Sequence, residues 1–292
     1  MTTVMKAFNV GARYKTSGDL GVEIEVEGEG LPELNEYWRT ERDGSLRGES
    51  AEYVLRKPLT SEGVAKALCY LDKKYIDAGT VVHDSVRAGV HVHVNVQDIT
   101  VVELFSFITA YVVLEDLLVN YCGEYREGNL FCLRVRDADY LMYCLEKAAK
   151  DKAYGNLHTD LLRYASMNVK SLRQYGSLEF RAMRGTRDLG VINTWANLLL
   201  NLRNVAKEFD SPKDIIKFYE EHGAESFLER FLGEYKEEVS NHLTKEFNLQ
   251  DGIVRAYDLA TATDWDGYKT LDIGGLEFPL GTEFPDEPQQ DY

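Results

Sequence analysis

Two stretches of the chain place carboxylates and imidazoles at every second position, a spacing that suits metal binding. Residues 21–27 read GVEIEVE, so a β-strand would direct Glu23 and Glu25 to the face opposite its valines and isoleucine. Side chains two residues apart lie roughly 6.5–7 Å apart on one strand face. Two carboxylates at this distance can bracket a pair of divalent cations with an anionic ligand between them. A solvent-facing edge strand of an acidic protein would show the same pattern.

The second stretch, residues 89–96, reads GVHVHVNV and contains two of the six histidines. Alternation places His91 and His93 together on the face opposite the valines. Two imidazoles at this spacing can bind one metal, or divide between a metal and a nucleotide phosphate. The alternative interpretation is a polar strand face without a ligand.

Two other segments offer further ligands. Residues 176–183 read GSLEFRAM, and alternation places Glu179 and Arg181 on one face, where they could equally form a simple ion pair. Glu52 follows the turn-like sequence DGS at residues 43–45, and polar and apolar residues alternate less regularly around it than in the other three segments. Glu49 competes with Glu52 for any role on that strand.

If these polar faces belong to one sheet, their side chains converge as oxygen and imidazole ligands for hard divalent cations. Metals and a guanidinium together neutralise the charge that moves in phosphoryl transfer. The chain has neither GxxxxGKS nor GxxxxGKT, so an ATP site would have to be of a sheet-and-metal type. The converging residues would be Glu23, Glu25, Glu52, His91, Glu179 and Arg181.

The charge composition narrows the classes of partner. The 292 residues include 49 acidic and 33 basic side chains, which gives a formal net charge of −16. Such a surface repels phosphate backbones and anionic lipids, so we expect neither nucleic-acid nor membrane binding. An anionic substrate such as a nucleotide would need arginines, or divalent metal held by the excess carboxylates, to reverse this field locally.

The cysteine pattern and the N-terminus indicate a reducing, cytoplasmic location. The four cysteines are scattered without a CxxC pair, and the first residues lack a signal-peptide pattern. The most apolar segment, residues 101–121, is interrupted by Glu103, Glu115 and Asp116. It is therefore expected to be a buried helix rather than a membrane span.

Helices are predicted where apolar residues recur at helical spacing. Thr100 and Glu103 form a capping-box signal before one of them, and Ser211-Pro212 marks a later helix start. We divide the chain into a core, a helical C-terminal part and an acidic, proline-containing tail. The predicted helices are residues 61–78, 101–121, 138–152 and 189–209, and the three parts are residues 1–210, 211–275 and 276–292.

The ordered set of these motifs resembles a known enzyme family. The segments GVEIEV, DGSL with AEYVLRKPL, GVHVHV, and RYASMN with GSLEFRAMRGT follow the order and approximate spacing of the carboxylate-amine ligases. These are the amidoligases of the glutamine synthetase superfamily, and the likeness is strongest to the variety encoded by bacteriophages. The resemblance covers roughly residues 21–204. Each motif is short, but the ordered set is specific.

The resemblance implies an α+β fold, with a curved antiparallel sheet, helices on its convex side and a helical C-terminal part. It also implies ATP with Mg²⁺ or Mn²⁺ in the concave face, and a host-cytoplasmic location if the chain is phage-encoded. Arg134 and Arg136 could bind a substrate carboxylate, although ordinary surface charge explains them equally well. The matching positions imply metal ligands at Glu23, Glu25, Glu52, His91 and Glu179, a nucleotide-side His93, a phosphate-stabilising Arg181 helped by Arg184 or Arg187, and Asn168 near substrate or nucleotide.

The implied activity is ATP-dependent formation of an amide bond. Transfer of the γ-phosphoryl group to a carboxylate would give an acyl phosphate, which an amine then attacks. The sequence LRK at residues 55–57 stands where the family has small residues, which leaves the role of Glu52 and the shape of the nearby substrate pocket open. Two rival functions are a phosphotransferase acting on a guanidino group and a non-catalytic protein that binds metal and nucleotide. Free amino acids, peptidoglycan peptides, protein side chains and polyamines all stay open as substrates.

Overall fold

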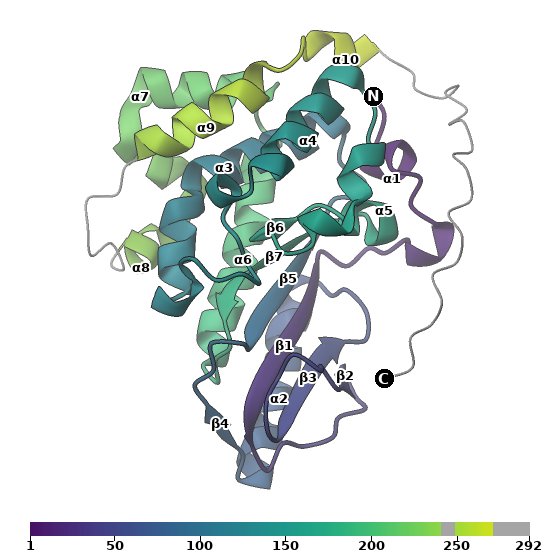
Figure 1. Ribbon diagram of the computed structural model, residues 1–292, viewed down its shortest axis with the longest axis vertical. Coiled ribbons are helices and arrows are strands. Elements are labelled where there is room, and N and C mark those ends of the chain that lie inside the picture. Colours follow the sequence, from purple (N-terminus) through teal and green to yellow (C-terminus); the bar gives the residue numbers. More distant parts are fainter. Residues whose placement is uncertain (241–248, 271–292) are drawn as a thin grey trace.

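The computed structural model describes residues 1–240 and 249–270. An open, seven-stranded antiparallel sheet has the strand order β2-β3-β1-β5-β7-β6, and β4 pairs with β1 beside this path. Helices pack against one face of the sheet, so the expected α+β class is confirmed (Figure 1). The strands are β1 (Leu20–Glu29), β2 (Trp38–Glu41), β3 (Ser50–Leu55), β4 (Val81–His83), β5 (Gly89–Asn95), β6 (Met167–Asn168) and β7 (Ser177–Arg184).

The α-helices follow the chain from the N-terminus to the C-terminal part. The helix predicted at residues 61–78 forms with those bounds, and the other predicted helices form within a few residues of theirs. The helices are α1 (Val4–Ala7), α2 (Ser61–Ala78), α3 (Val101–Cys122), α4 (Asp139–Asp151), α5 (Ser171–Tyr175), α6 (Leu189–Ala206), α7 (Pro212–Leu232), α8 (Lys236–Ser240), α9 (Leu249–Thr261) and α10 (Asp266–Thr270).

One face of the sheet forms the core, because the apolar residues that alternate with polar ones in β1, β5 and β7 point to it. Val22 of β1 and Val92 of β5 are buried there. Phe180 of β7 packs against Phe107 and Tyr111 of α3, with ring centroids 5.5 Å and 4.8 Å apart. Helices α2 and α6 cover the rest of this face. The polar residues of the same strands are therefore left on the opposite face.

Helix α3 is buried on almost every side, which explains why its sequence is apolar around the whole helix. Its predicted capping box is present: the Thr100 hydroxyl accepts from the Glu103 amide at 3.2 Å, and the Glu103 carboxylate accepts from the Thr100 amide at 2.6 Å. The sheet lies on one side of α3 and α9 on another (Figure 1). A Cβ at Gly252 of α9 would stand 2.2 Å from the Val113 carbonyl oxygen, so glycine permits this close packing.

The C-terminal part is helical where the structure describes it. Ser211 precedes α7 and Pro212 is its first residue, as the sequence predicted. Gly223, with φ of 76°, interrupts α7. The expected tail, residues 276–292, lies outside the described residues. No helix within the described ranges is both long and apolar enough to span a membrane.

Candidate active site

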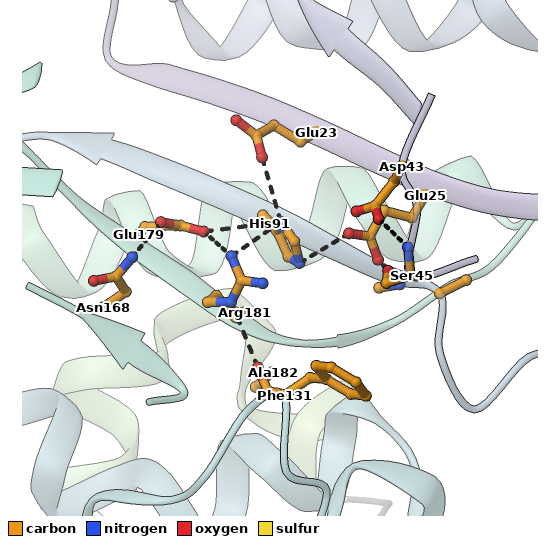
Figure 2. A network of polar contacts seen from close by, with 12 residues as sticks. Glu23, Glu25, Asp43, Ser45, His91, Phe131, Asn168, Glu179, Arg181 and Ala182 are labelled. Atoms are coloured by element: carbon orange, nitrogen blue, oxygen red, sulfur yellow. Dashed lines mark hydrogen bonds and ion pairs between the residues drawn. The ribbon is translucent and has the colours of Figure 1, made fainter. Parts of the chain in front are cut away.

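The register of the sheet brings the sequence-predicted polar residues together on its open face. Glu23 of β1 is paired directly with His91 of β5, and His93 of β5 with Glu179 of β7. Directly opposed residues of antiparallel strands have Cβ atoms only about 4.5–5.5 Å apart. Figure 2 shows Glu23 and Glu179 pointing toward His91 from their separate strands.

Three of these side chains offer ligand atoms that fit one divalent cation. The ligand atoms of Glu23, His93 and Glu179 all lie within 4.8 Å of one another. The His93 Nε2 is 3.4 Å from a Glu23 oxygen, and the His93 Nδ1 is 3.1 Å from the Ser177 hydroxyl. Carboxylate oxygens with an imidazole form a donor set that Mg²⁺, Mn²⁺ or Zn²⁺ accepts. The sequence had assigned His93 to the nucleotide and His91 to the metal, whereas this geometry groups His93 with the two glutamates.

His91 lies on the same face and adjoins three carboxylates. Its Nδ1 is 3.3 Å from Glu23 and 3.8 Å from Glu179, and its Nε2 is 3.7 Å from Glu25. The Arg181 Nη1 also lies 3.4 Å from the His91 Nδ1. That nitrogen can either accept from Arg181 or donate to Glu23, so the tautomer of His91 decides which neighbour it bonds.

The cations of this cluster lower the pKa values of two of its carboxylates, the half-buried Glu23 and the buried Glu179. Burial raises the pKa of Glu23, but hydrogen bonds from His91 and His93 outweigh it, and the net pKa is lowered. Burial likewise opposes ionisation of Glu179, yet the charges of His93 and Arg181 hold its pKa below the usual value. The pKa of His93 is raised in turn, because its bond to Glu23 outweighs its burial.

Arg181 lies at a β-bulge of β7. Val90 pairs with Met183 and Val92 with Phe180, so three steps along β7 match two steps along β5. The alternation of inward and outward side chains that the sequence predicts therefore holds as far as Arg181. Beyond it the pattern shifts by one residue, so the Met183 side chain points into the core. The guanidinium of Arg181 donates to Glu179.

A buried arginine that the sequence analysis missed holds this bulge in place. Arg126, in a 3₁₀ turn after α3, donates from Nε to the Ala182 carbonyl at 2.9 Å and from Nη2 to the Arg181 carbonyl at 2.7 Å. It is only 2% exposed, and its Nη1 finds no hydrogen-bond acceptor among the described residues. Nothing in its local sequence distinguishes it, because the contact joins segments 55 residues apart.

Glu25 and Glu52 lie at the other end of the cluster. They are paired directly across β1 and β3. Burial, followed by the charges of Glu23 and Glu25, raises the pKa of Glu52 to about 7. The competing Glu49 instead accepts from the Leu31 amide at 3.3 Å in an exposed position. The structure thus places Glu52, rather than Glu49, beside the cluster.

Asp43 also stands beside Glu25, as Figure 2 shows. The sequence had treated this residue only as part of a turn, and its carboxylate indeed accepts from the Ser45 amide at 2.6 Å. Burial opposes ionisation of Asp43, but its bonds from Ser45 outweigh it and lower the pKa. Glu25 accepts from the Gly89 amide at 2.8 Å, yet burial raises its pKa.

Asn168 supports the cluster from the edge strand β6. Its Nδ2 donates to Glu179 at 2.6 Å, and its Oδ1 accepts from the Lys170 amide at 2.9 Å. Because both ends of the amide are bonded within the protein, Asn168 orients Glu179. The sequence analysis had expected it near substrate or nucleotide.

Three other sequence-predicted arginines lie outside the cluster. Arg184 donates to the carbonyls of Tyr121 and Cys122 at the end of α3, 3.3 Å and 3.2 Å away. Arg187 stands over the ring of Tyr75 at 5.9 Å. Arg134 pairs with three acidic side chains, Glu127 at 3.1 Å, Asp137 at 3.2 Å and Asp116 at 3.6 Å. The side chain of Arg136 lies outside the described part of the structure.

A cavity of about 620 Å³ opens beside Glu23 and His93. Cationic side chains line it from three separate segments, and Glu23 is the one acidic residue among the described residues of its wall. This positive lining stands out in a protein with a net charge of −16. These cationic residues come together only in the folded chain, although the sequence had singled out the segment LRK at residues 55–57. The cations are Arg13, Lys15, Arg39, Arg56 and Lys57.

Comparison with known families matches one continuous segment of the chain. Residues 58–203 match a family described as "Putative amidoligase enzyme". The match contains β5 and β7, which carry His91, His93, Glu179 and Arg181, and also β6, which carries Asn168. Strands β1 and β3 precede the matched segment. No curated protein matches the chain.

Proposed function

The chain belongs to the amidoligase family, and from that premise we propose that it is an ATP-dependent carboxylate-amine ligase of the glutamine synthetase-like type. The observation that carries the proposal is the convergence of Glu23, His93, Glu179 and Arg181 on one sheet face beside a positively lined cavity. Such a face provides metal ligands, a guanidinium and a phosphate-attracting pocket in one place.

Glu23, His93 and Glu179 would hold a divalent cation, with His91 and Glu25 next to them. The bound cation would supply positive charge against the phosphoryl oxygens of the nucleotide. The low pKa values of Glu23 and Glu179 fit this role, because a ligand carboxylate must be ionised. Asn168 and Arg181 fix the orientation of Glu179 from two sides.

The cationic cavity would take the triphosphate of ATP. Its arginines and lysines attract phosphate oxygens. Glu23 and His93, two of the three candidate metal ligands, line the same cavity. Tyr14 and Tyr175 also line the cavity and offer aromatic surface to a base. A nucleotide bound there would present its terminal phosphate to the cluster.

The reaction would proceed in two steps. A carboxylate oxygen attacks the γ-phosphorus of ATP, and the bond to the bridging oxygen of ADP breaks, which gives an acyl phosphate. The amine then attacks the acyl carbon, inorganic phosphate leaves, and the amine loses a proton. In this scheme Arg181, next to His91, would neutralise charge on the transferring phosphoryl group. Glu52, paired with Glu25 across β1 and β3, would accept the proton.

Hydroxylamine provides a general test, because it traps any acyl phosphate as a hydroxamate. Purified protein with ATP, Mg²⁺, hydroxylamine and a panel of carboxylates should form hydroxamate together with equal ADP and phosphate, as measured by mass spectrometry. Glu179→Gln should lower this rate by about 100-fold or more, whereas the exposed control Glu220→Gln should leave it unchanged. A stable phosphorylated substrate would instead indicate a phosphotransferase. Binding of Mg-ATP without turnover of any carboxylate would indicate a non-catalytic protein.

A further inference from the structure

Gln97 lies in the turn that follows β5, and its side chain joins two segments that are far apart in the sequence. The residue is only 1% exposed. Its Nε2 donates to the carbonyls of Tyr14 and Tyr175, each at 2.8 Å. Its Oε1 accepts from the Thr16 amide at 3.1 Å. The whole side-chain amide is therefore used to hold the segment before β1 against the end of α5.

The side chain of Gln97 is itself held in one place. Its backbone amide donates to the Asn95 Oδ1 at 2.9 Å, and its backbone carbonyl accepts from the Met5 amide at 3.0 Å. Gly176 packs against it, because a Cβ at position 176 would stand only 2.5 Å from the Gln97 Cγ. The φ of Gly176 is 67°, a conformation that also favours glycine. Gln97 is thus a fixed attachment point for the segments that it contacts.

Residues 13–16 line the cationic cavity, and we call them the cationic segment. Within the described part of the chain, the hydrogen bonds that link this segment to distant residues all run to the side chains of Gln97 and Asn95. The contact with Asn95 is the longest of them, at 3.4 Å from its Nδ2 to the Thr16 carbonyl. The position of this part of the cavity wall therefore depends chiefly on Gln97.

The cationic segment carries two charges that an anionic ligand can use. Arg13 and Lys15 are exposed, and neither forms an ion pair among the described residues. The Arg13 guanidinium lies over the Tyr14 ring, 4.7 Å from its centroid, and its Nη2 donates to the Tyr14 hydroxyl at 2.9 Å. Gln97 bonds the backbone of Tyr14 and of Thr16, the residues on both sides of Lys15. It therefore determines where both cations lie.

We propose that Gln97 is a positioning residue for the nucleotide, because it holds Arg13 and Lys15 in the wall of the cavity that takes the phosphates. The inference rests on the proposed ligase function and identifies a residue that sets the affinity for ATP. Gln97 does not line the cavity, so it acts through the cationic segment without contacting the nucleotide. Its side-chain bonds do not involve the three candidate metal ligands, so its loss should weaken nucleotide binding and leave the metal cluster intact.

Calorimetric titration with Mg²⁺ and the non-hydrolysable ATP analogue AMP-PNP measures the expected loss of affinity. Gln97→Met keeps the size of the side chain but removes its hydrogen bonds, so the Kd should rise about tenfold or more, the factor that one charge-assisted contact contributes. The KM for ATP in hydroxamate formation should rise in parallel, with kcat unchanged. The matched control is Asn201→Leu, which removes a similar amide bond, from the Asn201 Nδ2 to the Phe231 carbonyl at 2.8 Å, between α6 and α7. It should change none of these values.

Limited digestion with trypsin tests the attachment of the cationic segment without any nucleotide. Trypsin cleaves after Arg13 and Lys15, and Gln97→Met should accelerate both cuts relative to wild type and Asn201→Leu, because a released segment is accessible to the protease. If Gln97→Met does not fold, Gln97→Asn, which keeps an amide on a shorter side chain, should show the same changes to a smaller extent. A folded Gln97 variant with wild-type cleavage and wild-type Kd would overturn the inference and leave the ligase function standing.

A double-mutant cycle shows whether Gln97 acts through the two cations. Arg13→Gln with Lys15→Gln should by itself raise the Kd for AMP-PNP about tenfold or more. Adding Gln97→Met to these changes should raise the Kd by less than about threefold, because its effect needs the cations. Effects that multiply would show that Gln97 only supports the fold, which would overturn the inference. Wild-type protein that binds no AMP-PNP in the presence of Mg²⁺ would overturn the inference and the proposed nucleotide site together.

Discussion

Two buried carboxylates, Glu179 on β7 and Glu115 on α3, share a residue type and a low exposure, but their pKa values shift in opposite directions. Glu179 is 7% exposed and Glu115 is fully buried. Arg181 and His93 stand beside Glu179 and lower its pKa against the effect of burial. Glu115 accepts from the Ser166 hydroxyl and the Val135 amide, and burial outweighs these bonds and raises its pKa to about 7.

The comparison shows that cations, rather than burial, decide which carboxylate is ready to bind a ligand. An ionised Glu179 with oxygens facing the open side of the sheet can coordinate a metal. Glu115 serves as a link between α3 and the segment before β6. The two regions meet at Ser166, whose hydroxyl bonds Glu115 and whose carbonyl accepts from the Arg181 amide at 2.8 Å.

The largest expected effect comes from removing the fork of donors beside Glu179. Arg181→Lys keeps the positive charge but cannot reproduce the planar guanidinium, so turnover should fall by about 100-fold or more while the protein stays folded. ADP release and melting temperature are measured on the same preparation. Arg230→Lys, which changes an exposed arginine paired with Glu208, is the control. A folded, fully active Arg181→Lys protein would limit Arg181 to pairing with Glu179.

The second prediction concerns the pH dependence that Glu115 gives to stability. Its pKa is near 7 in the folded protein but 4.5 when exposed, so the unfolded chain releases this proton first as pH rises. The free energy of unfolding should therefore fall by about 3 kcal/mol between pH 4.5 and 7 through this group. Glu115→Gln should remove that slope, and the exposed Glu220→Gln should retain it. Urea unfolding across this pH range measures both, and parallel curves for wild type and Glu115→Gln would contradict the assignment.

Much of the fold could be predicted from local patterns. The alternation in residues 21–27 and 89–96 fixes which side chains share a face, because the buried valines permit only one orientation of each strand. The sequence of α3 likewise predicts that the helix is buried, but it does not predict which elements cover it. Helix α9 packs against α3, and only the structure shows that Gly252 permits this contact.

The candidate site could be predicted only where a residue lies on a regular strand. Glu23, His91 and Glu179 come together because the strands pair in register. Arg126 and Asp43 act across long separations from irregular segments, so no local pattern marks them. The bulge in β7 could not be seen either, because alternation read from one strand does not show how its partner pairs.

The third prediction contrasts the two carboxylates by metal binding. Saturating Mg²⁺ or Mn²⁺ should stabilise the folded protein, by about 2.7 kcal/mol at a metal concentration 100 times the Kd. For a chain of this size that corresponds to a rise of roughly 5–10 °C in melting temperature. Glu179→Gln should abolish the rise, whereas Glu115→Gln should leave it intact. An equal rise in both variants would place the metal outside the cluster of Glu23, His93 and Glu179.

The smallest expected effect comes from Ser166, where the two regions meet. Ser166→Ala removes the hydroxyl that donates to Glu115 and accepts from Tyr111 at 3.2 Å, but it keeps the backbone carbonyl that holds Arg181. Stability should fall by about 1–3 kcal/mol, because buried polar groups lose a partner.

Since the Ser166 hydroxyl lowers the pKa of Glu115, its loss should also move the pH-dependent step in stability to higher pH. Turnover should stay within about twofold of wild type, because neither the charge nor the backbone position of Arg181 changes. Urea unfolding at several pH values and ADP release from the same Ser166→Ala preparation separate the two effects. A large loss of turnover in a folded variant would show that Glu115 and Arg181 act as one unit, and the division between the two buried carboxylates would then fail.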